Sequence, residues 1–285
     1  MRLKYEKVIH RAIVNNLFGL GYTKKSCNAQ GSSKYYLFVT APFIYREEIM
    51  EFKDRVVVVT GGAHGIGQSI AEDFRKEGAF VEIIDKVKVQ GNHYVGDIAS
   101  KETLESFVSY VLDKHGHIDY LINNALPLML GIDECSYEEF QYALSVGVTA
   151  PFYLTKLFKE YFNDDAVIIN ISSSRDRMSQ ANTESYTAAK GGISALTHAL
   201  MMSLSGKVRV NSISPGWIDT HGNTYTGPDA YQQPVGRVGN PEDISSMVLF
   251  LCSSKATFIN GENICIDGGM TKQMIYHEDG GWHLN

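Results

Sequence analysis

From Val56 onward the chain alternates short apolar segments with segments of helical periodicity, and this alternation restricts the fold more than any other feature. The first apolar segment, Val56 to Val59, is hydrophobic at every position and does not alternate with polar residues. Strands of this kind are typical of a parallel sheet whose two faces are both covered by helices. The sequence therefore predicts an α/β fold, a doubly wound parallel sheet in a single domain.

The expected elements follow one another as repeated strand–helix units. Hydrophobic runs predict strands at 55–60, 80–85, 93–97, 120–125, 166–172, 208–216 and 262–269. Amphipathic patterns predict helices at 67–78, 105–116 and 243–253, and a further helix is expected around Tyr186. The connections between these elements are short enough for one compact unit.

The first 49 residues differ from the rest in charge. They hold eight of the 26 Lys and Arg residues and three of the 32 Asp and Glu residues, a net charge of +5, whereas the remainder carries −11. The sequence REEIM, which ends at Met50, is what a purine-rich ribosome-binding site before a start codon would encode if read in frame. We expect 1–49 to be an extension outside the fold, with a possible mis-assigned start, and 50–285 to be the domain. The alternative is a genuine basic, Tyr-rich arm.

Composition disfavours several classes of protein. The net charge of −6 argues against a nucleic-acid partner. No apolar run approaches the roughly 18 residues of a membrane span, and the start of the chain is too polar for a signal peptide, so we expect a cytoplasmic protein without a membrane partner. The four cysteines and nine histidines show no metal-ligand spacing, and no metal is expected.

A glycine-rich segment, TGGAHGIG at 60–67, lies between the first expected strand and the first expected helix. Gly61 permits a tight turn, Gly65 lets the backbone approach a pyrophosphate, and Gly67 allows close packing where the helix begins. The glycines are spaced GxxxGxG and not GxGxxG. A simple strand-to-helix turn is the alternative, but this context favours a dinucleotide site.

Asp85 ends the second expected strand, 18 residues after Gly67. A carboxylate there accepts hydrogen bonds from the ribose hydroxyls of the adenosine and repels a 2′-phosphate, which favours NAD over NADP. Lys86 could soften that repulsion, and His64 in the glycine segment is mostly neutral at pH 7. A solvated aspartate at a strand end is the alternative. NAD remains the expected cofactor, with NADP less favoured.

Tyr186 and Lys190 are four residues apart, with small side chains between and after them. At this spacing both lie on one helix face, which is also common in helices without a catalytic role. An adjacent ammonium stabilises a phenolate and lowers its pKa from about 10, so the pair could transfer a proton near neutral pH.

Seven motifs occur in a fixed order between about Val56 and Gly269. They are TGGAHGIG at 60–67, Asp85, GDI at 96–98, NNA at 123–125, NISS at 170–173, Tyr186 with Lys190, and SPGWIDT at 214–220. In this order they resemble the short-chain dehydrogenase/reductase family. The resemblance implies a Rossmann fold, a nicotinamide dinucleotide cofactor and a homotetramer or homodimer.

The same resemblance implies a role for each matching residue. Tyr186 would be the general acid/base, Lys190 would lower the pKa of the tyrosine and hold the nicotinamide ribose, and Ser173 would orient the substrate, with Ser174 as a neighbouring alternative. The implied cofactor contacts are Gly61, His64, Gly65, Ile66, Gly67, Asp85, Asp97, Ile98, Asn124, Ala125, Tyr186, Lys190, Pro215, Gly216, Ile218 and Thr220.

The chain departs from the family pattern at two places. Leu126 and Pro127 follow NNA, where the family has glycine. Gly147 stands where the family has an asparagine that supports a water-linked proton path to the lysine. The second departure puts the proton relay in question, although we expect activity because Ser173, Tyr186 and Lys190 are present.

Less of the sequence bears on the substrate. Arg175 or Arg177 could clamp an anionic group, or both could be loop arginines paired with Asp176. The segment of about 219–237 is polar and short for a substrate lid, which favours a small hydroxy or keto compound, and Trp217 could form an aromatic wall or belong to the core. The expected function is hydride transfer between nicotinamide and a small alcohol or ketone. The alternatives are an NADPH-linked 3-oxoacyl-carrier-protein reductase and a dinucleotide-binding protein with weak or lost catalysis.

Overall fold

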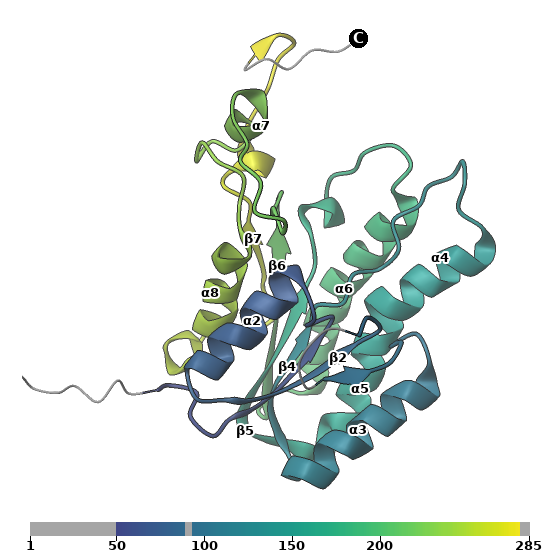
Figure 1. The fold of residues 1–285 in the computed structure, drawn as a ribbon, viewed down its shortest axis with the longest axis vertical. Helices are drawn as coiled ribbons and strands as arrows, with labels where there is room; N and C mark the ends of the chain where they lie inside the picture. The colour runs from purple at the N-terminus through teal and green to yellow at the C-terminus, as the bar shows by residue number, and fades with distance from the viewer. Residues whose placement is uncertain (1–49, 89–92, 280–285) are drawn as a thin grey trace, which may run out of the picture. The chain divides into compact units, whose positions relative to one another are not determined.

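The structure is a computed structural model that describes residues 50–88 and 93–279. A seven-stranded sheet lies at the centre of these residues (Figure 1). The strands are all parallel and lie in the order β3-β2-β1-β4-β5-β6-β7. The order reverses direction between β1 and β4, so the carboxyl ends of these two strands flank a crevice, where ligands bind in doubly wound sheets. The predicted α/β fold is confirmed.

The elements alternate along the chain as the apolar pattern predicts. The strands are β1 (Val56–Thr60), β2 (Phe80–Asp85), β3 (Tyr94–Val95), β4 (Ile118–Asn123), β5 (Phe162–Ile171), β6 (Val208–Pro215) and β7 (Asn263–Ile266). The α-helices are α2 (Gly65–Lys76), α3 (Lys101–His115), α4 (Tyr137–Leu144), α5 (Ala150–Phe158), α6 (Glu184–Ser203), α7 (Pro228–Tyr231) and α8 (Pro241–Cys252). A π-helical segment, η1 (Ser145–Thr149), joins α4 to α5, and a short 3-10 turn, η3 (Ser174–Asp176), follows β5.

Two hydrophobic layers cover the two faces of the sheet. Val56 and Val58 of β1 pack with side chains of α3, α5 and α6, whereas Val57 and Val59 pack with those of α2 and α8. Successive side chains of a strand point to opposite faces, so a strand that is apolar throughout contributes to both layers. This explains why β1 is buried at every position.

Some elements differ from the sequence expectation. The strand expected at 93–97 is reduced to the two residues of β3, and the strand expected at 262–269 to the four residues of β7. The π-helical segment Ser145–Thr149 was not expected, because its hydrogen-bonding pattern leaves no signature in residue periodicity. The expectation for 1–49 concerns residues outside those that the structure describes, and it stays a prediction. None of the described helices is both long and apolar enough to span a bilayer.

Candidate active site

The residues implied by the motifs gather around one cavity at the carboxyl end of the sheet, with a volume of about 580 Å³. Its lining includes Gly61, His64, Gly65, Ile66, Asp85, Asp97, Ile98, Asn124, Ala125, Ser173, Tyr186, Lys190, Pro215, Gly216, Ile218 and Thr220. Gly67 is buried outside this lining, and Ser174, the alternative to Ser173, is likewise buried outside it.

The glycine turn is shaped by close backbone approaches. Gly61 and Gly65 have positive φ angles of 66° and 56°, a conformation that side chains disfavour. A Cβ at Gly67 would lie 2.2 Å from the carbonyl oxygen of Gly61, so α2 can approach the turn only without a side chain at this position. The turn therefore requires glycine for reasons visible in its geometry.

The start of α2 leaves backbone donors available for an anion. His64 is the residue before the helix and makes no side-chain capping hydrogen bond, and the first turn contains no acidic residue. Uncapped N–H groups and the helix dipole together attract phosphate groups.

Hydrogen bonds fasten the NNA segment to the glycine turn. The Thr60 hydroxyl oxygen accepts from the backbone N–H groups of Asn124 and Ala125 at 3.0 and 3.1 Å. The Asn124 amide donates in return to the carbonyl oxygens of Thr60 and Gly61 at 3.1 and 2.9 Å. The two segments that line this part of the cavity thus form one rigid unit.

The Asp85 carboxylate is held at the end of β2. Its two oxygens accept from the backbone N–H groups of Ala63 and Val87 at 3.0 and 2.9 Å. Lys86, which could offset its charge, places its ammonium nitrogen 5.7 Å from the centre of the Tyr142 ring. Asp85 therefore presents a fixed negative charge to the cavity.

Tyr142 is a lining residue that the sequence analysis missed. Its hydroxyl donates to the Asp97 carboxylate at 2.9 Å. Burial, together with this hydrogen bond, raises the pKa of Tyr142 to about 12, so it stays a donor. It lies in α4, remote in sequence from the motifs, and nothing in its neighbourhood along the chain marks it.

Tyr186 and Lys190 lie together on α6 as their spacing predicts. The Lys190 ammonium nitrogen is 5.5 Å from the centre of the Tyr186 ring and donates to the backbone carbonyl of Ile171 at 2.7 Å. Burial lowers the pKa of Lys190 to about 7. At this pKa the lysine of the cofactor-free protein is only partly protonated near neutral pH.

The pKa of Tyr186 differs from the sequence expectation, which was a lowered value caused by Lys190. Burial raises the pKa of Tyr186 above its ordinary value, and the groups that pull it down are the Ser173 hydroxyl and the Arg175 guanidinium. The physical reason is that desolvation acts on both members of the pair: it disfavours the phenolate, and it removes much of the charge of the lysine.

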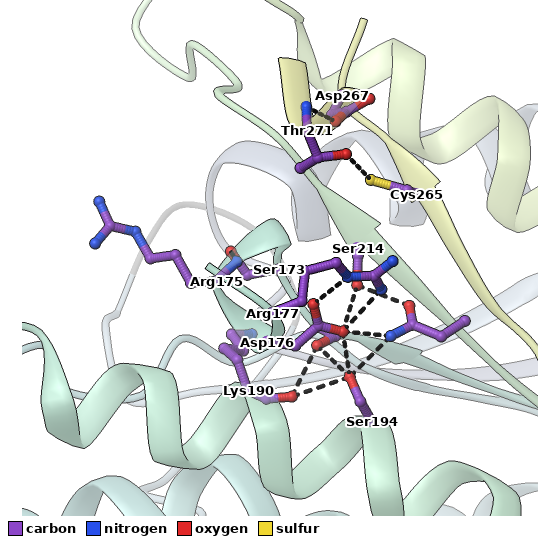
Figure 2. A network of polar contacts seen from close by, with 12 residues as sticks. Ser173, Arg175, Asp176, Arg177, Lys190, Ser194, Ser214, Cys265, Asp267 and Thr271 are labelled. Atoms are coloured by element: carbon purple, nitrogen blue, oxygen red, sulfur yellow. Dashed lines mark hydrogen bonds and ion pairs between the residues drawn. The ribbon is translucent and has the colours of Figure 1, made fainter. Parts of the chain in front are cut away.

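The two candidate arginines have different partners. Arg177 is paired with the Asp176 carboxylate through Nε at 2.7 Å and Nη2 at 3.0 Å. Arg175 points away from that pair (Figure 2) and donates through Nη2 to Gln180. Its Nη1 atom is buried and has no partner among the described residues. Of the two arginines that could pair with Asp176, only Arg177 does so among the described residues. The Arg175 guanidinium has no carboxylate partner there and lies close enough to lower the pKa of Tyr186.

Gly147 is enclosed within η1. A Cβ at this position would lie 2.7 Å from the Cβ of Ala189 and 3.3 Å from that of Pro127. The two departures from the family pattern, Gly147 and Pro127, are therefore neighbours in space. The asparagine that the family carries would have no room here.

The predicted substrate loop, 219–237, contains the short helix α7. Its end folds against the turn after β7, where the Val235 N–H donates to Gly268 at 3.1 Å. Trp217 packs edge-on against Tyr225 with ring centres 4.8 Å apart, and it lines a second cavity of about 230 Å³ instead of the larger one. The aromatic wall expected from Trp217 is not part of the larger cavity.

A nicotinamide dinucleotide suits the residues around the cavity. The glycine turn, which has no room for a Cβ at Gly67, and the uncapped start of α2 suit a pyrophosphate. The Asp85 carboxylate suits an adenosine ribose. Ser173, Tyr186 and Lys190 lie at the other part of the same lining and can supply a hydroxyl and a proton.

Comparison with known proteins agrees with this geometry. The family model described as Enoyl-(Acyl carrier protein) reductase matches residues 61–271. An uncharacterised oxidoreductase of Thermotoga maritima is 38% identical over 79% of this chain and 98% of its own length. The L-fucose dehydrogenase of Mus musculus is 34% identical over 78% of this chain and 90% of its own.

Solved structures include a chain with the same fold. An apo SCOR enzyme from Clostridium thermocellum is 45% identical, covers 81% of this chain and 98% of its own, and superimposes with a TM-score of 0.76. The extent of these matches, together with the ordered motifs around one cavity, shows that the chain belongs to the short-chain dehydrogenase/reductase family of oxidoreductases.

Proposed function

We propose that this protein is an NAD-dependent oxidoreductase that interconverts a small polar alcohol and the corresponding ketone or aldehyde. The observation that carries the proposal is the position of Ser173, Tyr186 and Lys190 in the lining that also contains the glycine turn and Asp85. A proton-transferring group and a dinucleotide cradle in one cavity are what such an interconversion requires.

The side chains would act as follows. The bound nicotinamide supplies the site for hydride exchange. Tyr186 donates its phenolic proton to the carbonyl oxygen during reduction and accepts the alcohol proton during oxidation. The Ser173 hydroxyl, which lowers the pKa of Tyr186, orients the substrate oxygen beside it. Lys190, fixed by its hydrogen bond to Ile171, would hold the nicotinamide ribose.

The preference for NAD rests on Asp85. Its carboxylate is held by two backbone N–H groups and retains lone pairs for ribose hydroxyls. A 2′-phosphate placed there would meet a like charge. Lys86 lies over the Tyr142 ring, a position that supports this reading because the ammonium is already engaged.

The substrate class is small and polar. The short polar loop of 219–237 argues against a long acyl chain, and the similarity to a dehydrogenase named for L-fucose supports a sugar or related polyol as the first class to test. Arg175 lies outside the cavity lining and its Nη1 atom is buried, so its charge would act on Tyr186 and not by direct contact with the substrate.

Two other functions remain as competitors. A 3-oxoacyl-carrier-protein reductase has support only from the family model, whose name refers to the acyl carrier protein but to an enoyl substrate, and Asp85 disfavours its NADPH. A dinucleotide-binding protein without catalysis is motivated by Gly147, where the family has asparagine. We also expect a cytoplasmic homodimer or homotetramer, which light scattering on the purified protein and cell fractionation would measure.

The deciding experiment combines binding and turnover. Fluorescence titration would measure the affinities for NADH and NADPH, and the same samples would then be tested with sugars, hydroxy acids and ketones. We expect tighter NADH binding and turnover of at least one polar alcohol, and a Tyr186→Phe variant that binds NADH normally without turnover. NADH binding without turnover of any compound would favour the binding protein, and tighter NADPH binding with reduction of a 3-oxoacyl thioester would favour the reductase.

A further inference from the structure

Asp176 has the most extensively bonded buried carboxylate next to the candidate active site. Its side chain is 5% exposed. It accepts hydrogen bonds from Ser194 at 2.9 Å, Ser214 at 3.2 Å, Asn263 and the guanidinium of Arg177 (Figure 2). These partners come from α6, β6, β7 and the end of η3, so one side chain joins four parts of the fold.

One arm of this network reaches Ser173. Asp176 closes the short turn η3, and its backbone N–H donates to the Ser173 carbonyl at 3.0 Å. The Ser173 hydroxyl accepts from the Arg175 N–H at 3.2 Å within the same turn. Asp176 and Ser173 are therefore held in one hydrogen-bonded turn.

The other arm reaches Lys190. The Ser194 hydroxyl, which contacts Asp176, lies 3.0 Å from the Lys190 carbonyl oxygen. The Ser172 hydroxyl lies 2.9 Å from the same carbonyl and 2.8 Å from the Ser194 hydroxyl. A hydroxyl has one proton to donate, so Ser194 bonds the Asp176 carboxylate while Ser172 bonds the Lys190 carbonyl. Helix α6 is thus tied to the carboxylate and to the residue before Ser173.

We propose that Asp176 is a positioning residue that holds the Ser173 turn in register with the stretch of α6 that carries Tyr186 and Lys190. The proposal rests on the proposed function for what these three residues do. Asp176 lies outside the cavity lining. It acts on α6 through Ser194 and on Ser173 through its own backbone N–H group.

The chemistry of the network requires a carboxylate. Its partners Asn263 Nδ2 and Arg177 Nε are donors that cannot accept, so an asparagine at 176 would direct an N–H group toward N–H groups. The pKa of Asp176 lies below its ordinary value, because hydrogen bonds from Arg177, Ser194 and Asn263 outweigh the effect of burial. The ionised acceptor is therefore the form present at neutral pH.

Two serine variants separate positioning from general stability. Ser194→Ala removes the hydroxyl that joins Asp176 to α6, four residues after Lys190, whereas Ser214→Ala removes a hydroxyl from the same carboxylate oxygen on the sheet side. Neither variant changes a charge. Each protein would be assayed for kcat, KM, NADH affinity and melting temperature, with Asp176→Ala and Asp176→Asn alongside.

We expect Asp176→Ala and Ser194→Ala to lower kcat by about tenfold and to weaken NADH binding by about threefold, because small displacements of catalytic groups reduce rates steeply. For Ser214→Ala we expect both quantities within about twofold of wild type at a similar loss of melting temperature. In the double variant Asp176→Asn/Ser194→Ala, kcat should fall by a factor smaller than the product of the factors for the two single variants.

Equal effects of Ser194→Ala and Ser214→Ala on kcat and on NADH affinity would overturn the proposal and leave Asp176 a structural residue. NADH affinity keeps the test independent of turnover. A wild-type protein that binds NADH without turnover would refute the proposed function, and the affinities of the two serine variants would still decide the role of Asp176.

Discussion

The Lys190 ammonium nitrogen lies 5.5 Å from the centre of the Tyr186 ring, where the lysine is buried and the tyrosine is half-buried. Desolvation raises the pKa of the tyrosine and lowers that of the lysine, so the two pKa values, which are nearly equal in the free side chains, move apart. The phenol therefore keeps its proton at a pH where the lysine of the cofactor-free protein loses its own.

The stability of the cofactor-free protein should depend on pH through Lys190. Its pKa is about 7 in the folded protein and about 10.4 in an unfolded chain. Between these values the unfolded chain binds more protons, so stability is lowest below about 7 and rises with pH toward about 10. Lys190→Met has no such titration, and its stability relative to wild type should therefore fall across this window. Urea unfolding of both proteins at several pH values measures the difference, and a constant difference would contradict the assigned pKa.

Arg175 should tune the proton transfer of Tyr186. Its guanidinium lowers the pKa of the tyrosine, so Arg175→Met should raise that pKa further. In the direction of alcohol oxidation, where the phenolate is the base, the rising limb of kcat/KM against pH should move to higher pH. Arg175→Lys keeps the charge and serves as the control. An unshifted limb in the methionine variant would show that the charge of Arg175 does not reach the phenol.

Asp85 should determine the choice between the two dinucleotides. Asp85→Asn removes the charge and replaces one of its two acceptor oxygens by an N–H donor, so NADH binding should weaken, NADPH should be repelled less, and the affinity ratio should change by about tenfold or more. Glu72→Gln, which removes an exposed charge on α2, is the matched control. Fluorescence titration measures all four affinities. If the ratio is the same in Asp85→Asn and wild type, cofactor preference must come from other residues.

Gly67→Ala should weaken dinucleotide binding. The new Cβ would lie 2.2 Å from the Gly61 carbonyl oxygen and 2.4 Å from the Asn124 amide nitrogen, so the glycine turn must shift away from α2. We expect about tenfold weaker NADH binding and about 1–3 kcal/mol of destabilisation. Gly191→Ala, which adds a Cβ in open space on α6, should change neither quantity. Normal NADH affinity in Gly67→Ala would mean that the turn does not hold the pyrophosphate.

Restoring an asparagine at 147 should impair the protein. Even a Cβ there would press against Ala189 and Pro127, so we expect Gly147→Ala to cost about 1–3 kcal/mol and Gly147→Asn to cost more. Thermal melts of these variants beside Gly191→Ala measure this. A stable and more active Gly147→Asn protein would show instead that the missing asparagine limits turnover.

Local chemistry along the chain was enough to predict the parallel sheet, the glycine turn and the role of Asp85, whereas the family resemblance supplied most other members of the cavity lining. Continuous apolar strands, the glycine turn after Val59 and the carboxylate at the end of β2 are each determined within a few residues, and their order indicates where they meet. The sheet topology brings the carboxyl ends of its strands to one edge, which is why motifs spread from Gly61 to Thr220 line a single cavity.

Tertiary structure decided the features that depend on contacts between distant residues and on burial. Tyr142 of α4 donates to Asp97, and Asp176 accepts hydrogen bonds from residues of α6, β6 and β7. The spacing of these residues along the chain does not indicate either contact. The direction of the Tyr186 pKa shift follows from desolvation, which a sequence does not display. Glycine is required at 147 because Pro127 and Ala189 occupy the space that a side chain would need, a contact that the sequence does not display. Residue spacing identifies neighbours within one helix or strand, whereas tertiary packing determines the pKa of Tyr186 and the space available at Gly147.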